Sequence, residues 1–195
     1  MKMDILREFR QLETERLILR ELKPTDAEAI FHYLSDPEVT QYLDTQPHQT
    51  VEQTRRLVNF LASLFEKGEG FRWGIVKKTG NSSQGTDVVI GTCGYHAWAK
   101  FHLRAEIGYE LAREYWGQGI MSEAIKTILA FGFDEMGLNR VEAMVLVGNV
   151  ASARFLEKLG FQQEGVLREY ELLQRAFKDL MLFSLLKNDY WASQR

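Results

Sequence analysis

The segment YWGQGI, residues 115–120, joins two regular patterns in the sequence. Before it, LRAEIGYEL (103–111) alternates apolar and polar residues as a strand does. After it, apolar side chains recur at helical spacing, at Ile120, Ala124, Ile128 and Phe131. The first N–H groups of a helix have no acceptor inside the helix, so a glycine-containing turn ahead of a helix can bind a phosphate. The segment therefore predicts a phosphate-binding turn between a strand and a helix.

Two common phosphate sites do not fit this spacing. A P-loop needs Lys and then Ser or Thr after its last glycine, whereas Gly119 is followed by Ile120 and Met121. The dinucleotide pattern G-x-G-x-x-G needs a glycine where Ser122 stands. Taken alone, G-x-G ahead of a helix is weak evidence, because a glycine-assisted helix start has the same sequence.

Around this segment the chain alternates strand and helix patterns. Strands are expected at 15–22, 71–78, 88–99, 103–111, 140–147, 161–171 and 176–187. Helices are expected after Pro24, after the capping box of Thr50 and Gln53, from 120 onward and over 149–159. A turn-rich stretch, 80–87, joins two of the strands. The order β-α-α-β-β-β-α-β-α-β-β, without repeat or linker, predicts a single mixed α/β domain over 1–195, with its core at about 13–187.

The composition excludes several classes of protein. The chain has 195 residues and a formal net charge of −3, whereas a nucleic-acid-binding protein would need a concentrated basic face. The single cysteine, Cys93, cannot form an internal disulfide, and the four histidines show no metal-ligand spacing with it. No apolar run resembles a signal peptide or a membrane span. We therefore expect a cytoplasmic protein that binds no nucleic acid, membrane or metal.

Three segments together carry a family resemblance: EIGYEL (106–111), YWGQGIMSEA (115–124) and NVASARFLEKLGF (149–161). They resemble the acetyl-coenzyme A-binding motifs of the general-control-related N-acetyltransferase (GNAT) superfamily. TERLILR (14–20), with W-G-x-G and N-x-x-S, resembles the branch that acetylates the N-termini of ribosomal proteins. The similarity runs from Glu13 to about Lys187. Glu114 stands where the glycine signature usually begins with Gln or Arg, but the binding that the family implies depends on backbone amides.

The resemblance implies a fold and a cofactor site. Strands 103–111 and 140–147 would be parallel neighbours that splay apart, with the pantetheine arm of acetyl-coenzyme A between them. The arm would bond main-chain groups near Leu111, as an added strand would, and would contact Asn149. The pyrophosphate would be held by Trp116, Gly117, Gln118, Gly119, Ile120, Met121 and Ser122.

Acetyl transfer to an amine requires a neutral amine and a stabilised leaving thiol. Glu106, on the polar face of strand 103–111, is our first candidate for the general base, because the family sometimes places a carboxylate there. A solvated or structural glutamate is an equally good interpretation. Glu142, on the neighbouring strand, is the second candidate. Tyr170 in REYE (168–171) is a further residue for the acceptor side, although a packing role is commoner.

The superfamily often uses a tyrosine as proton donor, in a pattern like Y-E-K-L-G-F, which here reads LEKLGF (156–161). Leucine has no proton to donate, so the resemblance passes the role to Ser152, which would orient or relay a proton. An ordinary serine at a helix start is an equally good interpretation. Cys93 has no histidine beside it in the sequence, so direct transfer is favoured over an acetyl-cysteine intermediate.

The leading hypothesis is an enzyme that acetylates the α-amino group of a protein or peptide, such as a ribosomal protein. A second version of the same activity acetylates a small amine: a polyamine, an aminoacyl compound or an antibiotic. A non-catalytic module that binds acetyl-coenzyme A is the alternative from another class. The oligomeric state stays open, with a homodimer as one option.

Overall fold

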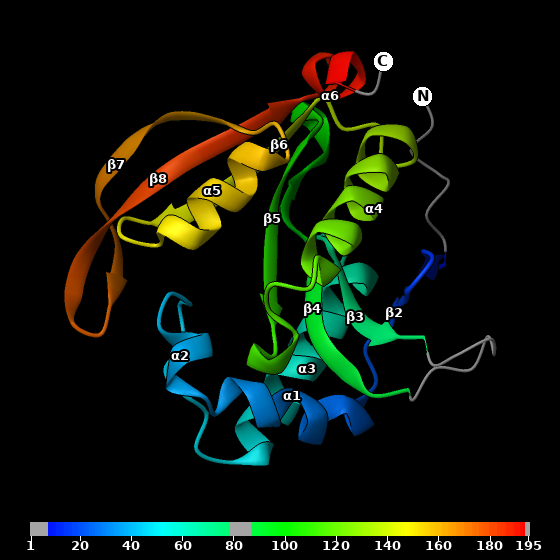
Figure 1. The fold of residues 1–195 in the computed structure, drawn as a ribbon, viewed down its shortest axis with the longest axis vertical. Helices are drawn as coiled ribbons and strands as arrows, with labels where there is room; N and C mark the ends of the chain where they lie inside the picture. The colour runs from blue at the N-terminus through cyan, green and yellow to red at the C-terminus, as the bar shows by residue number, and fades with distance from the viewer. Residues whose placement is uncertain (1–7, 79–86, 194–195) are drawn as a thin grey trace.

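The computed structural model describes residues 8–78 and 87–193, which form a single sheet of eight strands with helices around it (Figure 1). The strand order is β1-β2-β3-β4-β5-β6-β8-β7. The strands are β1 (Leu12–Glu13), β2 (Leu17–Glu21), β3 (Phe71–Lys77), β4 (Val89–Ala99), β5 (Arg104–Leu111), β6 (Arg140–Leu146), β7 (Gln162–Leu173) and β8 (Ala176–Leu186).

The described residues also form six α-helices and three 3-10 helices. The α-helices are α1 (Ala27–Leu34), α2 (Pro37–Thr40), α3 (Val51–Glu66), α4 (Ile120–Asp134), α5 (Val150–Lys158) and α6 (Lys187–Ser193). The 3-10 helices are η1 (Pro24–Asp26), η2 (Lys100–His102) and η3 (Arg113–Tyr115). The predicted order of elements is confirmed, with β1, α2 and α6 as additions. Most of the predicted turn at 80–87 lies outside the described residues.

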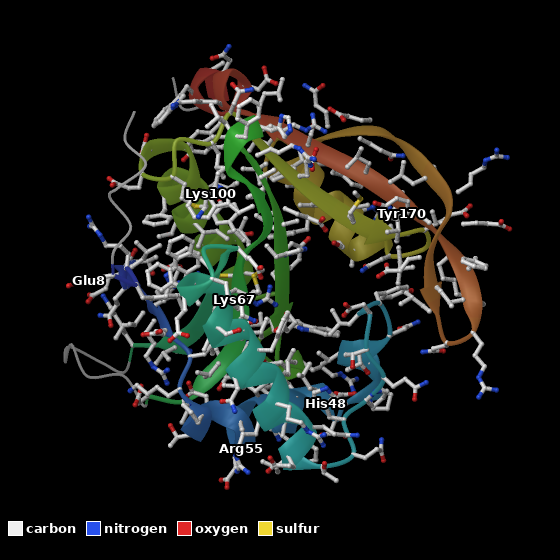
Figure 2. All side chains as sticks on the ribbon, turned by 180° about the vertical axis from the view of Figure 1, so that it is seen from behind. Glu8, His48, Arg55, Lys67, Lys100 and Tyr170 are labelled. Atoms are coloured by element: carbon white, nitrogen blue, oxygen red, sulfur yellow. The ribbon has the colours of Figure 1, made fainter. Side chains whose placement is uncertain are left out.

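Helices cover both faces of the sheet. On β5, Ala105 and Ile107 are buried in the cluster that includes α4, whereas Glu106 and Glu110 project from the opposite face. The opposite face of β3 and β4 is covered by α1 and α3. Figure 2 shows α3 on this side, and Tyr170 on the β7–β8 hairpin away from it. The predicted apolar face of β5 begins at Ala105, because Leu103 has a left-handed backbone and is 46% exposed.

The two central parallel strands pair over only three positions: Arg104 with Arg140, Ala105 with Val141 and Glu106 with Glu142. Beyond them β5 stays paired with β4 as far as Leu111, and β6 stays paired with β8 as far as Leu146. The facing edges of β5 and β6 therefore separate, as predicted. The gap in the ladder leaves main-chain groups without a strand partner on both edges.

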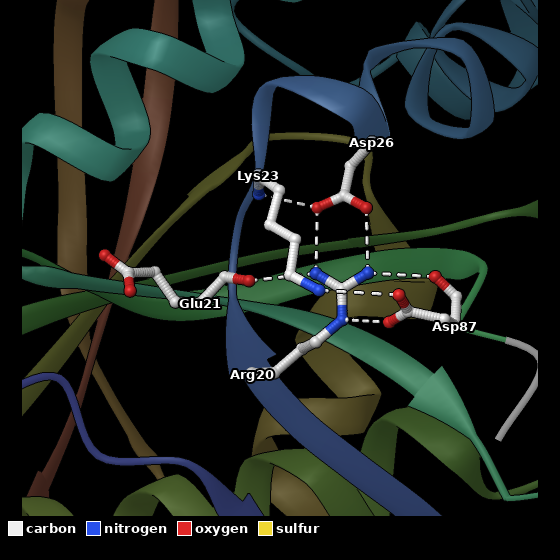
Figure 3. Close-up of polar contacts among 5 residues, drawn as sticks. All are labelled: Arg20, Glu21, Lys23, Asp26 and Asp87. Atoms are coloured by element: carbon white, nitrogen blue, oxygen red, sulfur yellow. Dashed lines mark hydrogen bonds and ion pairs between the residues drawn. The ribbon is translucent and has the colours of Figure 1, made fainter. Parts of the chain in front are cut away.

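A cluster of charged side chains joins β2 and η1 to the residues just before β4 (Figure 3). Arg20 donates two parallel hydrogen bonds to the Asp26 carboxylate, at 2.9 and 2.8 Å. It also donates to the side chain of Asp87 at 2.7 Å and to the backbone oxygens of Asp87 and Glu21. Because Arg20 and Asp26 are only 7% and 5% exposed, their pairing compensates for the loss of hydration.

Candidate active site

A cleft of about 1370 Å³ opens where β5 and β6 separate. It is lined by the start of α4, by α5 and, on the other side of the sheet, by the segment between α2 and α3. Pockets that bind one drug-sized ligand have volumes of about 300–1,000 Å³, so this larger cleft has room for two reactants. Among the described residues, no group of three or more His, Cys, Asp or Glu could hold a metal ion, and no helix is long and apolar enough to cross a membrane.

The turn ahead of α4 depends on two glycines. Gly117 and Gly119 have φ angles of +71° and +73°, a left-handed conformation that disfavours residues with a β-carbon. A β-carbon built on Gly117 would meet no atom within 4 Å, and one on Gly119 would meet only Arg16, at 3.5 Å. The protein therefore leaves open space in front of this turn, on the side of the cleft.

The first N–H groups of α4 face this open space. The first intrahelical bond at this end runs from Glu123 N to Gly119 O, at 3.1 Å. For the backbone N–H groups of Ile120, Met121 and Ser122 there is no acceptor within residues 8–78 and 87–193. The Ile120 side chain is 2% exposed and belongs to the core. Of this residue, only the backbone N–H can therefore make the predicted contact with a phosphate. Three free donors at a helix start are suited to an anion.

Arg16 is a neighbour of this turn for which sequence reasoning assigned no role. Its guanidinium donates to the Gln118 carbonyl oxygen at 3.1 Å and to the Glu123 carboxylate at 2.6 Å. The Gln118 amide donates to Glu114 O at 2.7 Å, so this predicted ligand-binding side chain is directed back at the turn. The signal for Arg16 was present in TERLILR (14–20), but its partners lie more than 100 residues away.

The main chain near Leu111 was predicted to bond the pantetheine arm. Trp116, which is 46% exposed, donates from its indole N–H to Leu111 O at 2.8 Å. A carbonyl oxygen has two lone pairs and can accept a second bond. The indole thus fixes the turn against the end of β5 and leaves one acceptor position of this carbonyl for a ligand.

The start of α5 brings together Asn149, Ser152 and a residue of β5. Asn149 Oδ1 accepts a hydrogen bond from Ser152 N at 3.2 Å and caps the helix. Ser152 Oγ lies 2.8 Å from the phenolic oxygen of Tyr109, and all three residues line the cleft. Leu156, at the position of the superfamily's tyrosine, is fully buried. Sequence reasoning placed Tyr109 among apolar strand residues, a pattern that gives no signal for a polar contact.

The two predicted base candidates occupy different environments. Glu106 lines the cleft and lies 3.3 Å from His96 Nε2. Glu142 is absent from the cleft lining and accepts hydrogen bonds from Arg104 at 2.8 Å and from Arg140 at 2.7 Å. Held between two guanidinium groups, Glu142 fits a structural role better than that of a proton acceptor.

Among the other carboxylates that line the cleft, two lie close enough to interact through their charges within this acidic group, and sequence reasoning missed both. They are Asp44, between α2 and α3, and Glu171, on β7. Burial, followed by the nearby charges of Asp44 and Glu106, raises the pKa of Glu171. No local pattern connects these residues, because they come from three distant segments of the chain.

The surroundings of several other side chains argue against a direct role in the chemistry. Burial raises the pKa of the Cys93 thiol to about 12, so this cysteine is not an effective nucleophile at neutral pH. Tyr170 is 59% exposed and is absent from the cleft lining. Arg72, also at the cleft, donates to Glu110 and to Thr92, so its charge is compensated by the Glu110 carboxylate.

Comparisons with known proteins agree with this geometry. Residues 16–162 match the family described as "Acetyltransferase (GNAT) domain", whose members use acetyl-coenzyme A. An uncharacterized N-acetyltransferase of Bacillus subtilis (strain 168), YoaA, is 42% identical over 179 residues, covering 92% of this chain and 98% of YoaA. The ribosomal-protein-serine acetyltransferase of Escherichia coli (strain K12) is 29% identical over 136 residues, 70% of this chain and 72% of that protein.

A solved structure shares the fold. The crystal structure of an acetyltransferase (GNAT family) from Bacillus anthracis superposes with a TM-score of 0.78 at 27% identity, over 92% of this chain and 99% of that chain. The family match spans most of the chain and includes β5, the glycine turn and α5. The chain therefore belongs to the GNAT family of acetyltransferases.

Proposed function

We propose that this N-acetyltransferase binds acetyl-coenzyme A in the cleft and transfers the acetyl group directly to a primary amine. The observation that carries the proposal is the set of free N–H groups of Ile120, Met121 and Ser122, which open onto the cleft beside Arg16. Such donors fit a pyrophosphate. The separated edges of β5 and β6 fit the amide groups of a pantetheine arm, which would bond them as an added strand does.

The acceptor side of the cleft is acidic. Asp44, Glu106 and Glu171 line it, and a negative surface attracts a protonated amine. An N-terminal α-amine has a pKa of about 8, against about 10.4 for a lysine side chain, so it loses its proton more readily at neutral pH. This difference favours an α-amino group over a lysine side chain, and we favour the α-amino group of a protein or peptide, such as a ribosomal protein, as the acceptor. The similarity to a relative named ribosomal-protein-serine acetyltransferase supports this choice.

Glu106 is the proton acceptor that we favour, because it lies at the position where β5 and β6 part. In the reaction the amine nitrogen attacks the thioester carbon, and the N–C bond forms. The C–S bond then breaks and its electron pair leaves with the sulfur of coenzyme A. The amine proton passes to the carboxylate and from there to solvent. Glu171 is the second candidate, since its raised pKa brings it closer to that of an effective general base.

Release of coenzyme A with a panel of amines tests the proposal. The panel contains a peptide with a free N-terminus, the same peptide blocked at its N-terminus but carrying lysine, a polyamine and an aminoglycoside. We expect the free peptide to be the best acceptor. Activity with the polyamine or the aminoglycoside alone would show that the acceptor class is wrong. Coenzyme A release with none of them, from protein that binds acetyl-coenzyme A, would favour a binding module.

Matched glutamine variants test the base. Glu106→Gln should lower turnover with the preferred acceptor by about 10²-fold, the usual size of general-base assistance. The residual rate should rise with pH towards the pKa of the free amine. Glu142→Gln is the control, because Glu142 pairs with Glu106 in the strand register but lies outside the cleft lining. If Glu171→Gln is inactive while Glu106→Gln is active, the role belongs to Glu171.

A further inference from the structure

Tyr109 and Ser152 form a hydroxyl pair at the cleft. They come from β5 and α5, 43 residues apart, and their oxygen atoms are 2.8 Å apart. Tyr109 Oη has no other hydrogen-bonding partner within the described part of the chain. The Tyr109 ring packs edge-on against Phe155 of α5, with 5.2 Å between ring centroids. This packing holds the phenol at the start of α5.

Either hydroxyl group of the pair could donate to the other, and the surroundings of the phenol favour donation from Tyr109. Burial raises the pKa of Tyr109 to about 12, against the opposing effect of the bond with Ser152, so the phenol keeps its proton throughout the neutral range. Within the described residues, Ser152 Oγ is the acceptor in reach of the part-buried phenol, so donation by the phenol satisfies its O–H. When Ser152 Oγ accepts a hydrogen bond from the phenol, the hydroxyl hydrogen of Ser152 remains free to point into the cleft.

The position of this phenol bears on the missing tyrosine of α5. Leu156 occupies that position and its side chain is fully buried in the core. Tyr109 brings a phenol to the start of the same helix from the neighbouring strand. The cleft therefore contains a tyrosine hydroxyl, although the helix does not supply it.

We propose that Tyr109 is a positioning residue that acts through Ser152: it donates to Ser152 Oγ and thereby directs the serine O–H at the sulfur of departing coenzyme A. This inference rests on the proposed function. As the C–S bond breaks, the sulfur takes the electron pair, and the serine proton is shared with it in a hydrogen bond. Both hydroxyl groups keep their protons, and the thiolate is protonated by solvent after release.

The acidities support a hydrogen bond in place of a proton transfer. A thiol of ordinary pKa, about 8.5 by analogy with cysteine, is a stronger acid than the Tyr109 phenol at about 12. Complete transfer of a proton from the phenol to the thiolate would therefore be unfavourable. A chain of two hydroxyl groups polarises along its length, which strengthens the bond that Ser152 makes to developing negative charge.

Titration of the bound coenzyme A thiol tests the pair without any acceptor. The ultraviolet absorbance of the thiolate is followed against pH for free coenzyme A and for coenzyme A bound to the wild type, Tyr109→Phe and Ser152→Ala. Cys93 is the single cysteine, and with a pKa of about 12 it stays protonated in the range of interest. We expect the bound thiol to have a lower pKa than the free thiol, and both substitutions to reverse most of that shift.

An unchanged thiol pKa on binding, or an unaltered shift in Tyr109→Phe, would overturn the inference. Failure of coenzyme A to bind the wild type would overturn the proposed function along with it. Bound coenzyme A with a shifted thiol, in a protein that acetylates none of the amines, would leave the hydroxyl pair in place and contradict the proposed acetyl transfer, in favour of a binding module.

Kinetics with an accepted amine form the second test. Tyr109→Phe should lower kcat about fivefold to tenfold, the scale of one hydrogen bond, without changing the KM for acetyl-coenzyme A. If Tyr109 acts through Ser152, the double variant should be no slower than Ser152→Ala. Fully additive losses would mean that Tyr109 acts independently. Tyr33→Phe is the control, because its buried hydroxyl has no hydrogen-bonding partner among the residues that the structure describes, and Tyr33 is absent from the cleft lining.

Discussion

Substitution of Gly119 by alanine separates the backbone requirement of the glycine turn from its role in binding. At a φ of +73°, a β-carbon costs about 1–2 kcal/mol, which for a chain of this size lowers Tm by roughly 2–8 °C. The same β-carbon projects into the open space before the N–H groups of α4. Loss of one charge-assisted hydrogen bond costs about 1.5–3 kcal/mol, so acetyl-coenzyme A should bind at least tenfold more weakly, a change of about 1.4 kcal/mol.

Gly137→Ala is the matched control. Gly137 has a φ of +68° and nothing within 4 Å of a built β-carbon, and it lies beyond the far end of α4, away from the cleft. Thermal unfolding should show similar losses for both variants, whereas calorimetric titration with acetyl-coenzyme A should show weaker binding for Gly119→Ala alone. Unchanged affinity of Gly119→Ala would refute the pyrophosphate assignment. Equal weakening in both variants would refute the local explanation.

Two further predictions concern stability. Arg20→Met leaves the buried Asp26 carboxylate without its bidentate partner and should lower the free energy of unfolding, measured by chemical denaturation, by about 3–5 kcal/mol. The double variant Arg20→Met/Asp26→Leu should recover most of this loss. An equal loss in the single and the double variant would contradict this explanation. Hydrogen bonds from Arg140, then from Ser184, lower the pKa of Glu164 from 4.5 to about 2. The stability that this group contributes is therefore present above about pH 4.5 and lost as the pH falls towards 2. Urea unfolding of Glu164→Gln should show a weaker pH dependence in that interval; an unaltered slope would exclude the pair as its cause.

The order of elements could be predicted because each long element carries its own periodicity. The alternation of Ala105 and Ile107, and the helical stripe from Ile120 to Phe131, needed no knowledge of their partners. The Thr50–Gln53 capping box was likewise local, and it is confirmed. β1 and α2 contain two and four residues, too few for a period to appear.

The site was harder to predict, because its contacts join distant segments. Glu106 and Glu142 lie side by side in the register, and from the sequence only their order of preference could be given. What distinguishes them is the pair of arginines that holds Glu142. Tyr109 and Ser152 meet only after β5 and α5 have packed. Propensity within a segment contains no information about such contacts.

The separation of β5 and β6 also affects how the protein avoids aggregation. Unpaired strand edges recruit other chains, and proteins protect them by shortening, bending or covering them. Here the outer edges are β1, which has two residues, and β7, whose pairing with β8 shifts register twice. The unpaired inner edges are residues 107–111 of β5 and 143–146 of β6, and they lie in the cleft. Another folded chain is too bulky to reach these edges inside the cleft, whereas a slender extended ligand can. The separation of β5 and β6 therefore provides a binding site without exposing an edge to strands of other molecules.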